Sequence, residues 1–492
     1  MTRNISRRDF LKKSALATAG LSIVPNIVLG KGFGHISPSD KLNIAAVGIG
    51  GMGNANLGNM EKTENIVALC DVDWKYSKGV FDRLKDAKRY KDYRKMYDEM
   101  GKDIDAVLVA TADHTHAMIS ADAITMGKHV YCQKPLTHSV YESRLLTNLA
   151  AKYKVATQMG NQGASGEGVN LTCEWIWNGE IGEITKVECA TDRPIWPQGL
   201  MTPEKADKIP STLDWDLFTG PARMKPFNNI YHPWNWRGWW DYGTGALGDM
   251  ACHIMHPVFM ALNLGYPTKV QGSSTLLLQD CAPQAQHVKY IFPARENMPK
   301  VAMPEVEVHW YDGGMMPDRP AGFPQGKELM QSGGGLVIFH GTKDTLICGC
   351  YGANPWLISG RVPNAPKVCR RVNVSHEQDW IRACKETPAN RVMTKSDFSS
   401  AGPFNEMVVM GVLAVRLQNL NKELLWDGAN MKFTNIGPDE QIKIIIKDGF
   451  KVHDGHPTFN KDWTEPLNAQ QFAQELIKHN YRDGWKLVDM PA

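Results

Sequence analysis

The sequence has almost no excess of charge of either sign. Its 55 Lys and Arg residues nearly balance its 52 Asp and Glu residues, which leaves a formal net charge of +3 over 492 residues. A charge this small gives no electrostatic reason to bind nucleic acid or an anionic membrane surface. We therefore expect no nucleic-acid partner.

The sequence also lacks the cysteine spacing of a disulfide framework or of a zinc site. Its 10 cysteines are spread widely, several of them inside apolar runs, and Cys348 and Cys350 are one residue too close for a CxxC motif. Internal repeats and long low-complexity tracts are absent as well. We expect buried free thiols in a chain of two or three domains, and no bound metal.

The N-terminal segment contains a short apolar run that follows a twin-arginine pair. Arg7 and Arg8 lie in the stretch SRRDFLK, and a moderately apolar run covers residues 14–29. This arrangement is typical of a Tat export signal, and the run is too short for a stable membrane span. We interpret residues 1–37 as a Tat signal and linker, which predicts export of the folded protein to the periplasm. A chance basic N-terminus is the alternative, and an uncleaved signal is the one membrane anchor we consider.

A glycine-rich segment follows the first apolar run of strand length. Residues 42–47 lead directly into Gly48, Gly50 and Gly53, which have the spacing GxGxxG. In a strand–turn–helix unit these glycines allow a tight turn, the approach of a pyrophosphate and close packing of the helix. The free N–H groups at the helix N-terminus then bind the phosphates. The pattern predicts a dinucleotide-binding unit, and a glycine-rich surface turn is the alternative.

An acidic residue ends the next apolar run. Residues 66–70 are of strand type, and Asp71 follows them 18 residues after Gly53. The acid that binds a ribose 2′-OH is expected about 20 residues after the third glycine. A carboxylate there would repel a 2′-phosphate, so the sequence favours NAD over NADP.

Strands and helices alternate up to about residue 160. Strands are expected at residues 105–110, 128–132 and 155–159, and helices at residues 117–126 and 141–153. This alternation predicts a doubly wound parallel sheet, and we assign residues 38–160 to an NAD-binding Rossmann domain. Ligands bind beyond the carboxyl ends of such strands, so a crevice should form there. The residues expected beside the glycine loop in it are Thr111, His116, Lys134 and Pro135.

Strands dominate the second part of the chain. They are expected at residues 184–190, 269–278, 286–292, 306–311, 335–340 and 345–350. Several alternate polar with apolar residues, which predicts a large, open, mostly antiparallel sheet in an α+β domain. We assign residues 161–492 to this domain, with helices at 376–385 and 406–420 returning towards the first domain. The overall class is therefore α/β, and the second domain is expected to bind substrate and to form a homo-oligomer.

Four motifs resemble the Gfo/Idh/MocA family, named after glucose–fructose oxidoreductase and inositol dehydrogenase. They are residues 111–116 (TADHTH), 127–130 (GKHV), 133–136 (QKPL) and 239–253 (WWDYGTGALGDMACH). The third motif is usually Glu-Lys-Pro in this family, so Gln133 removes a negative charge beside Lys134. Lys134 itself resembles the family's catalytic lysine. The fourth motif is similar to the segment in which an Asp and a His, here Asp249 and His253, enter the active site.

Asp249 and His253 also form a plausible catalytic pair on physical grounds. Positions four apart share one face of a helix, and the glycine-rich residues 243–248 would bring the backbone close to a ligand. His253 can accept the proton of a sugar hydroxyl, Lys134 can stabilise its oxygen, and Asp249 can orient the imidazole or the substrate. A structural histidine is one alternative. A zinc site that includes His256 is another, but it lacks a clear fourth ligand.

The predicted site has three overlapping parts. The catalytic residues are Lys134, Asp249 and His253. The cofactor residues are Gly48, Gly50, Gly51, Met52, Gly53, Asp71, Thr111, His116, Gln133 and Lys134. The substrate residues, several of them on loops rich in tryptophan, are Arg193, Trp196, His232, Trp236, Arg237, Asp249 and His253. Packing by aromatic anchors is the alternative for those on loops.

These observations predict an exported NAD-dependent oxidoreductase. Hydride would pass between a ring hydroxyl carbon of a sugar or glycoside and a tightly bound nicotinamide cofactor. The resemblance also implies an alternative, because the family includes glycosidases that oxidise, eliminate, hydrate and reduce again with retained NAD. A further alternative is a non-catalytic sugar-binding protein on a dehydrogenase fold, which only Gln133 favours.

Overall fold

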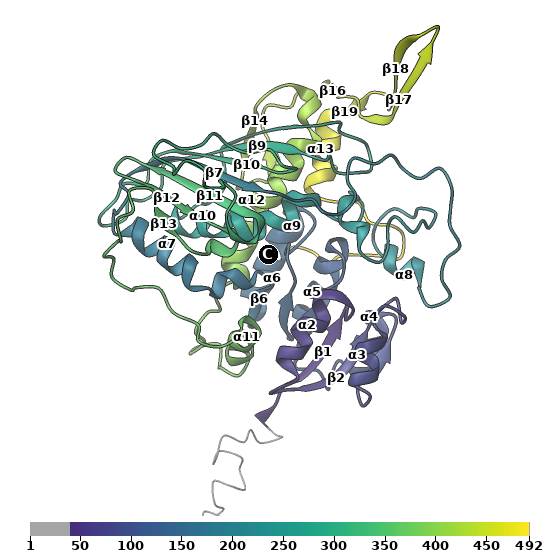
Figure 1. The fold of residues 1–492 in the computed structure, drawn as a ribbon. Coiled ribbons are helices and arrows are strands. Elements are labelled where there is room, and N and C mark those ends of the chain that lie inside the picture. Colours follow the sequence, from purple (N-terminus) through teal and green to yellow (C-terminus); the bar gives the residue numbers. More distant parts are fainter. Residues whose placement is uncertain (1–39, 492) are drawn as a thin grey trace, which may run out of the picture.

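The computed structural model describes residues 40–491, and Figure 1 shows its fold. The predicted Tat signal and linker, residues 1–37, lie outside the described residues. The rest of the chain forms two large sheets with helices around them, and two small two-stranded sheets.

The first sheet contains six parallel strands in the order β3-β2-β1-β4-β5-β6. The strands are β1 (Asn43–Val47), β2 (Asn65–Cys70), β3 (Lys88–Tyr90), β4 (Ala106–Val109), β5 (His129–Cys132) and β6 (Thr157–Met159). The helices that follow them are α2 (Gly51–Met60), α3 (Lys78–Arg83), α4 (Tyr93–Met100), α5 (His116–Thr125) and α6 (Val140–Tyr153). The strand order reverses between β1 and β4, which is where ligands bind in such sheets. The prediction of a doubly wound parallel sheet is confirmed.

The second sheet contains nine strands in the order β13-β12-β11-β7-β10-β9-β8-β14-β15. Only β7 and β10 pair in parallel, so the predicted mostly antiparallel sheet is also confirmed. The six expected strands are β7 (Ile184–Thr191), β8 (Lys269–Ser274), β9 (Gln286–Phe292), β10 (Val306–Tyr311), β11 (Gly335–Gly341) and β12 (Thr345–Cys348). Three short edge strands were not expected: β13 (Trp356–Leu357), β14 (Leu424–Asp427) and β15 (Lys432–Phe433).

Helices join the two sheets into one body. The helix α12 (Phe398–Arg416) contacts β8 and β9 on one side and α6 on the other. By length and composition it could cross a membrane, but 83% of its apolar window is buried inside the protein. The helix α11 (His376–Cys384) packs on α2, as expected for a segment that returns to the first sheet. The remaining helices of this region are α7 (Glu167–Trp177), α8 (Trp215–Thr219), α9 (Gly245–Ile254) and α10 (His256–Ala261).

The expected start of α12 was wrong. The sequence placed it at residue 406, after Pro403, but the helix begins eight residues earlier with Asp397 as its N-cap. Asp397 accepts a hydrogen bond from the backbone N–H of Ser399. Pro403 therefore lies near the second turn, where tertiary packing on α6 compensates for the one backbone hydrogen bond that proline removes.

The C-terminal part contributes a small lobe and a projecting hairpin. Two short strands, β16 (Gln441–Ile442) and β19 (Leu467–Asn468), pair with each other, and α13 (Ala469–Ile477) follows them. Between them β17 (Ile445–His453) and β18 (His456–Trp463) form a hairpin that extends away from the body in Figure 1. This hairpin is remote from the carboxyl edge of the first sheet, where the main cleft lies.

Candidate active site

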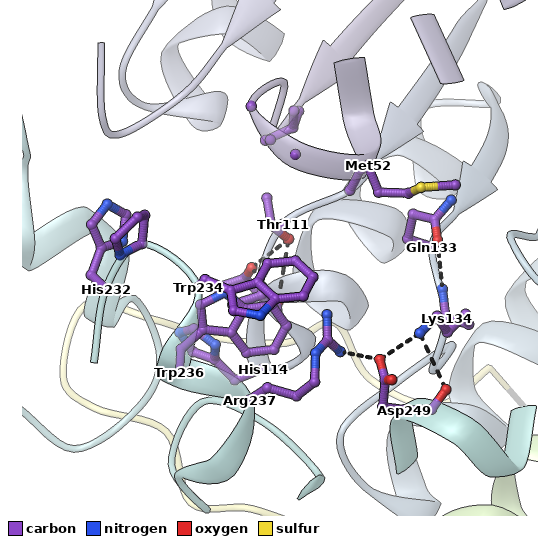
Figure 2. A pocket seen from close by; sticks show the side chains of 18 of the residues that line it. Met52, Thr111, His114, Gln133, Lys134, His232, Trp234, Trp236, Arg237 and Asp249 are labelled. Carbon is purple, nitrogen blue, oxygen red and sulfur yellow. Dashed lines mark hydrogen bonds and ion pairs between the residues drawn. The ribbon is translucent and has the colours of Figure 1, made fainter. Parts of the chain in front are cut away.

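A cleft of about 420 Å³ lies beyond the carboxyl ends of the first sheet and reaches α9 of the second domain. The glycine-rich loop, Asp71, Lys134, Asp249 and His253 all line it. Residues from three distant parts of the chain thus meet in one cavity, and Figure 2 shows a close view.

The glycine loop adopts a geometry that side chains would disrupt. Gly48 has a φ of +77°, and a Cβ there would lie 2.5 Å from the carbonyl oxygen of Ala110. A Cβ on Gly53 would lie 2.0 Å from the carbonyl oxygen of Gly48, so α2 packs directly on the loop. A Cβ on Gly50 would meet the ring of Tyr76 at 2.2 Å. No side chain caps the N-terminus of α2, which leaves its N–H groups available to an anion.

Asp71 lies at the end of β2 and faces the same cleft. Its two carboxylate oxygens accept hydrogen bonds of 2.9 Å from the backbone N–H groups of Ile49 and Asp73. Burial raises the pKa of Asp71 to about 6, although these two backbone bonds favour the charged form. The carboxylate is thus held rigidly and is mostly ionised at neutral pH.

His232 lies at the Asp71 end of the cleft and not beside Asp249. Its Nε2 is 3.0 Å from a carboxylate oxygen of Asp73, and its ring packs against Phe218 with centroids 4.9 Å apart. Figure 2 shows it well away from Lys134. The sequence assigned His232 to the substrate, but the structure places it next to the region expected for the ribose. The tryptophan-rich loop that carries it runs along the whole cleft, which sequence order alone does not show.

Asp249 is the meeting point of two cations. Lys134 Nζ lies 2.5 Å and Arg237 Nη1 2.8 Å from the same carboxylate oxygen, and they approach it from either side in Figure 2. Lys134 also donates to the Asp249 carbonyl oxygen over 3.1 Å. Burial by itself would raise the pKa of Asp249, but Arg237 and Lys134 hold it well below its usual range. Asp249 therefore stays ionised and fixes the position of the lysine ammonium group.

Arg237 is held by tryptophan side chains as well as by Asp249. Its guanidinium carbon lies 4.4 Å, 5.2 Å and 5.7 Å from the ring centres of Trp236, Trp234 and Trp196, respectively. All four side chains line the cleft. Such cation–π contacts restrict the guanidinium and leave the indole faces as an apolar wall for a ligand.

His253 lies one turn after Asp249 on α9, on the face expected from the spacing. It is 6% exposed, lines the cleft, and contacts the ring of Tyr351 edge-on with centroids 4.6 Å apart. Burial, and then the charge of Lys134, lowers the pKa of His253 well below 6.5. The imidazole is therefore neutral at neutral pH and able to accept a proton. Of the two roles considered for Asp249, the contacts do not include orientation of this imidazole, because the carboxylate bonds to Lys134 and Arg237.

The depressed pKa of His253 predicts an unusual pH dependence. A histidine base must be neutral to act, so a reaction that uses His253 as its base should keep kcat constant as the pH falls from 7 to about 6, below the ordinary imidazole value. The same group makes folding less favourable below pH 6.5, because only the unfolded chain then binds the proton. The measurement is a pH profile of kcat at saturating cofactor, where titration of Asp71 does not enter. An acid limb at pH 6.5 or above would contradict this assignment.

Gln133 lies in the cleft as predicted, whereas His116 does not. Gln133 lines the cleft, but its amide donates to Asn56 over 2.8 Å, and Asn56 in turn donates to Glu377 over 2.7 Å. A buried carboxylate thus remains nearby, on α11. His116 does not line the cleft, and its ring nitrogens lie 2.8 Å from the Pro135 carbonyl oxygen and 3.1 Å from that of Thr111. It joins the ends of two strands, which is a structural role.

Several residues that the sequence analysis missed also line the cleft. They are Tyr76, His114, Trp234 and Tyr351. The backbone of Tyr351 has a φ of +63°. Residues other than glycine rarely adopt this left-handed conformation, and where they do it is often at a functional site. The alternative zinc site receives no support, because the His256 ring packs against Phe404 at 5.3 Å. Among residues 40–491 no three His, Cys, Asp or Glu side chains cluster as a metal site would require.

The fold and the cleft define a dinucleotide-binding α/β protein with a second, sheet-containing domain. Two models of one oxidoreductase family match the chain. Its NAD-binding Rossmann fold matches residues 42–161, and its C-terminal alpha/beta domain matches residues 193–293. These matches support assignment to the Gfo/Idh/MocA oxidoreductase family, in agreement with the motifs at residues 111–136 and 239–253.

Curated relatives with similar sequences include two kinds of enzyme. The inositol 2-dehydrogenase of Salmonella typhimurium is 27% identical over 147 residues, which cover 29% of this chain and 43% of that protein. The alpha-N-acetylgalactosaminidase of Shewanella oneidensis is 24% identical over 213 residues, which cover 38% of this chain and 46% of that protein. The chain thus matches less than half the length of these relatives.

Solved structures resemble the chain over most of its length. The WlbA dehydrogenase from Bordetella pertussis, in complex with NADH and UDP-GlcNAcA, has a TM-score of 0.53 at 14% identity, and the match covers 79% of this chain and 99% of that one. GenD2 from gentamicin A biosynthesis, in complex with NAD, has a TM-score of 0.52 at 16% identity, with 79% and 97% covered. At these identities the likeness shows the shared fold.

Proposed function

We propose that the protein is an NAD-dependent oxidoreductase that acts on a ring hydroxyl of a sugar or glycoside. The observation that carries this proposal is that one cleft contains both sets of groups. The neutral imidazole of His253 and the ammonium group of Lys134, which is held by Asp249, line the same cavity as the glycine loop and the uncapped N-terminus of α2. This combination is a proton acceptor and an oxygen stabiliser beside a dinucleotide cradle.

The residues of the cleft fit a dinucleotide. The loop at Gly48–Gly50 packs too closely on Ala110 and Tyr76 to admit a Cβ, and the N-terminus of α2 offers N–H groups to a pyrophosphate. Asp71 would accept from the ribose hydroxyls and would repel a 2′-phosphate, which favours NAD over NADP. When bound, NAD would supply the acceptor for the hydride. Thr111 and Gln133 line the same part of the cleft.

The chain's own groups divide the proton chemistry between them. The neutral imidazole of His253 accepts the proton of the substrate hydroxyl. The ammonium group of Lys134 donates to the same oxygen and stabilises the negative charge that develops on it. Asp249 holds this ammonium group in place, and Arg237 keeps Asp249 ionised. The tryptophans around Arg237 exclude water and offer flat apolar faces to a sugar ring.

Asp71→Asn is expected to weaken NAD binding by about 10-fold and to reduce the preference for NAD over NADP, because the substitution removes the charge that accepts from the ribose. Titration calorimetry with both dinucleotides measures this effect. Asp103→Asn, which changes an exposed carboxylate outside the cleft, is the control. An unchanged NAD preference in Asp71→Asn would contradict the assigned role.

A second function uses the same residues. The similarity to the alpha-N-acetylgalactosaminidase of Shewanella oneidensis favours a glycosidase that oxidises a ring hydroxyl, eliminates the glycosidic substituent, adds water and reduces the product. Such a cycle returns NAD to its starting state. The third alternative, a non-catalytic sugar-binding protein, gives no reason for Lys134 and His253 to meet in the dinucleotide cleft.

A single assay separates these functions. The purified protein is incubated with a panel of sugars, inositols and glycosides while reduced cofactor, keto-sugar and free aglycone are followed. Reduced cofactor or a keto-sugar that accumulates without cleavage supports the dehydrogenase. Aglycone release without accumulation of reduced cofactor supports the glycosidase. Sugar binding without any turnover across the panel supports the non-catalytic alternative.

We also propose that the protein is exported through the Tat pathway to the periplasm and forms a homo-oligomer. The twin-arginine segment at residues 6–12 supports export, and an exported enzyme needs a cofactor that stays bound and is regenerated in place. The half-buried sheet of the second domain supports association. Cell fractionation after Arg7→Lys/Arg8→Lys, and light scattering of the purified protein, test these two points.

A further inference from the structure

A second cavity of about 200 Å³ lies behind the segment that leads into α9. Its walls come from the C-terminal end of α12, from α13 and the residues after it, and from the start of α6. Of the residues that line it, His114 alone also lines the main cleft. The cavity is thus a separate feature, to which the proposed function assigns no role.

Arg416, the last residue of α12, is the feature that distinguishes this cavity. Its guanidinium carbon lies 5.4 Å from the ring centre of Trp240 and 5.6 Å from that of Phe472, so two aromatic rings restrict its orientation. Within residues 40–491 the guanidinium has neither a hydrogen-bond acceptor nor a carboxylate at ion-pair distance. By contrast, Arg144 pairs with Glu406, and Arg295 donates to backbone carbonyl groups.

Three carboxylates line the cavity, and each has another partner; Glu475 accepts a hydrogen bond from the Gln471 amide over 3.4 Å. Asp241 lies 2.6 Å from Lys225 Nζ. The Glu142 carboxylate accepts from the Tyr481 hydroxyl over 2.8 Å through one oxygen, and its other oxygen accepts from two backbone N–H groups at the start of α6. None of the three lies at ion-pair distance from Arg416, which leaves a cation with open N–H donors in the cavity.

The guanidinium of Arg416 keeps its charge at neutral pH. Burial lowers the pKa of Arg416 to about 10, and the charges of Asp241 and Asp280 only partly offset this effect. Arg416 remains charged at neutral pH and is partly exposed, so an anion that enters the cavity can reach it. Arg223 also lines the cavity but pairs with Asp280 over 3.2 Å, and burial lowers the pKa of His138 well below its usual value.

We propose that this cavity is a binding site for a small oxyanion, a carboxylate or a phosphate, held by the guanidinium of Arg416. The planar fork of an arginine matches both groups. A volume of about 200 Å³ is several times the share of one water molecule, about 30 Å³, and is too small for a dinucleotide. The site is independent of the proposed catalytic function and can be tested without a substrate.

The test is a thermal-unfolding titration of the purified protein with acetate and with inorganic phosphate, at constant ionic strength against chloride. We expect at least one oxyanion to raise the unfolding midpoint by about 2 °C or more, and the comparison shows whether carboxylate or phosphate is preferred. Arg416→Gln should abolish this shift. Arg295→Gln, which changes another partly buried arginine that already has partners, should retain it.

The glycine loop of the main cleft is the other place where phosphate could bind, so Gly50→Val is included. A shift that persists in Gly50→Val and disappears in Arg416→Gln supports the proposal. A shift that disappears in Gly50→Val and persists in Arg416→Gln overturns it. The proposal is also overturned if acetate and phosphate change the unfolding midpoint of the wild-type protein no more than chloride does. If Arg416→Gln does not fold, a selenate-soaked crystal decides by its anomalous signal: a peak beside Arg416 supports the site, and its absence there overturns it.

Discussion

Lys134→Met is expected to lower kcat by about 100-fold or more, the cost of removing one preorganised donor from a developing oxyanion. The substitution keeps the length of the side chain but removes the ammonium group that lies 2.5 Å from Asp249. Arg237 still pairs with Asp249, so the carboxylate is not left alone in the cleft. Affinity for NAD should change little, because the glycine loop and Asp71 are untouched.

The same variant has a second, independent signature. Lys134 is the charged group that contributes most to the lowered pKa of His253. Its removal should therefore raise that pKa and move the acid limb of the kcat profile to higher pH. Lys78→Met, which changes an exposed lysine paired with Asp82, is the control. A Lys134→Met enzyme with wild-type turnover and an unshifted profile would show that this lysine does not take part in the chemistry.

Gly50→Val is expected to weaken NAD binding by about 100-fold or more. The pyrophosphate approaches the backbone at this second glycine of the loop, and a side chain there would displace it from its hydrogen-bond donors. The new side chain would first meet the ring of Tyr76. Tyr76 is 42% exposed and can move aside, so the variant should still fold. The valine side chain would then occupy the space that the pyrophosphate needs.

A matched control is available on the same helix. Gly58 also lies on α2, but a Cβ there meets nothing within 4 Å, so Gly58→Ala should retain full NAD affinity. Titration calorimetry gives both affinities, and circular dichroism checks that each variant is folded. Wild-type affinity in folded Gly50→Val would mean that the dinucleotide, if bound, lies elsewhere.

Local patterns explain why much of the site was predictable from the sequence. The glycine spacing specifies a turn and a helix start, and the spacing of Asp249 and His253 specifies one face of α9. Both signals depend on neighbours along the chain. The rule that parallel strands present ligands at their carboxyl ends then placed Lys134 beside the loop.

Contacts between distant segments were not predictable in the same way. Tyr351 reaches His253 from a turn after β12, and no local pattern marks that turn as part of the cleft. The sequence analysis placed His116 in the cleft, but His114 lines it instead. Both residues follow β4, and the ring nitrogens of both contact backbone carbonyl groups, so no local pattern distinguishes them. The pairing of Arg237 with Asp249 likewise depends on how a loop folds over α9.

The most direct test of the account asks whether the cleft holds its cofactor. The purified protein is denatured, and the supernatant is assayed for NAD(H) and NADP(H); any protein found empty is then titrated with both dinucleotides. The account predicts bound NAD, or uptake of NAD in clear preference to NADP, lost in Gly50→Val and retained in Gly58→Ala. A folded protein that contains no dinucleotide and takes none up would contradict it.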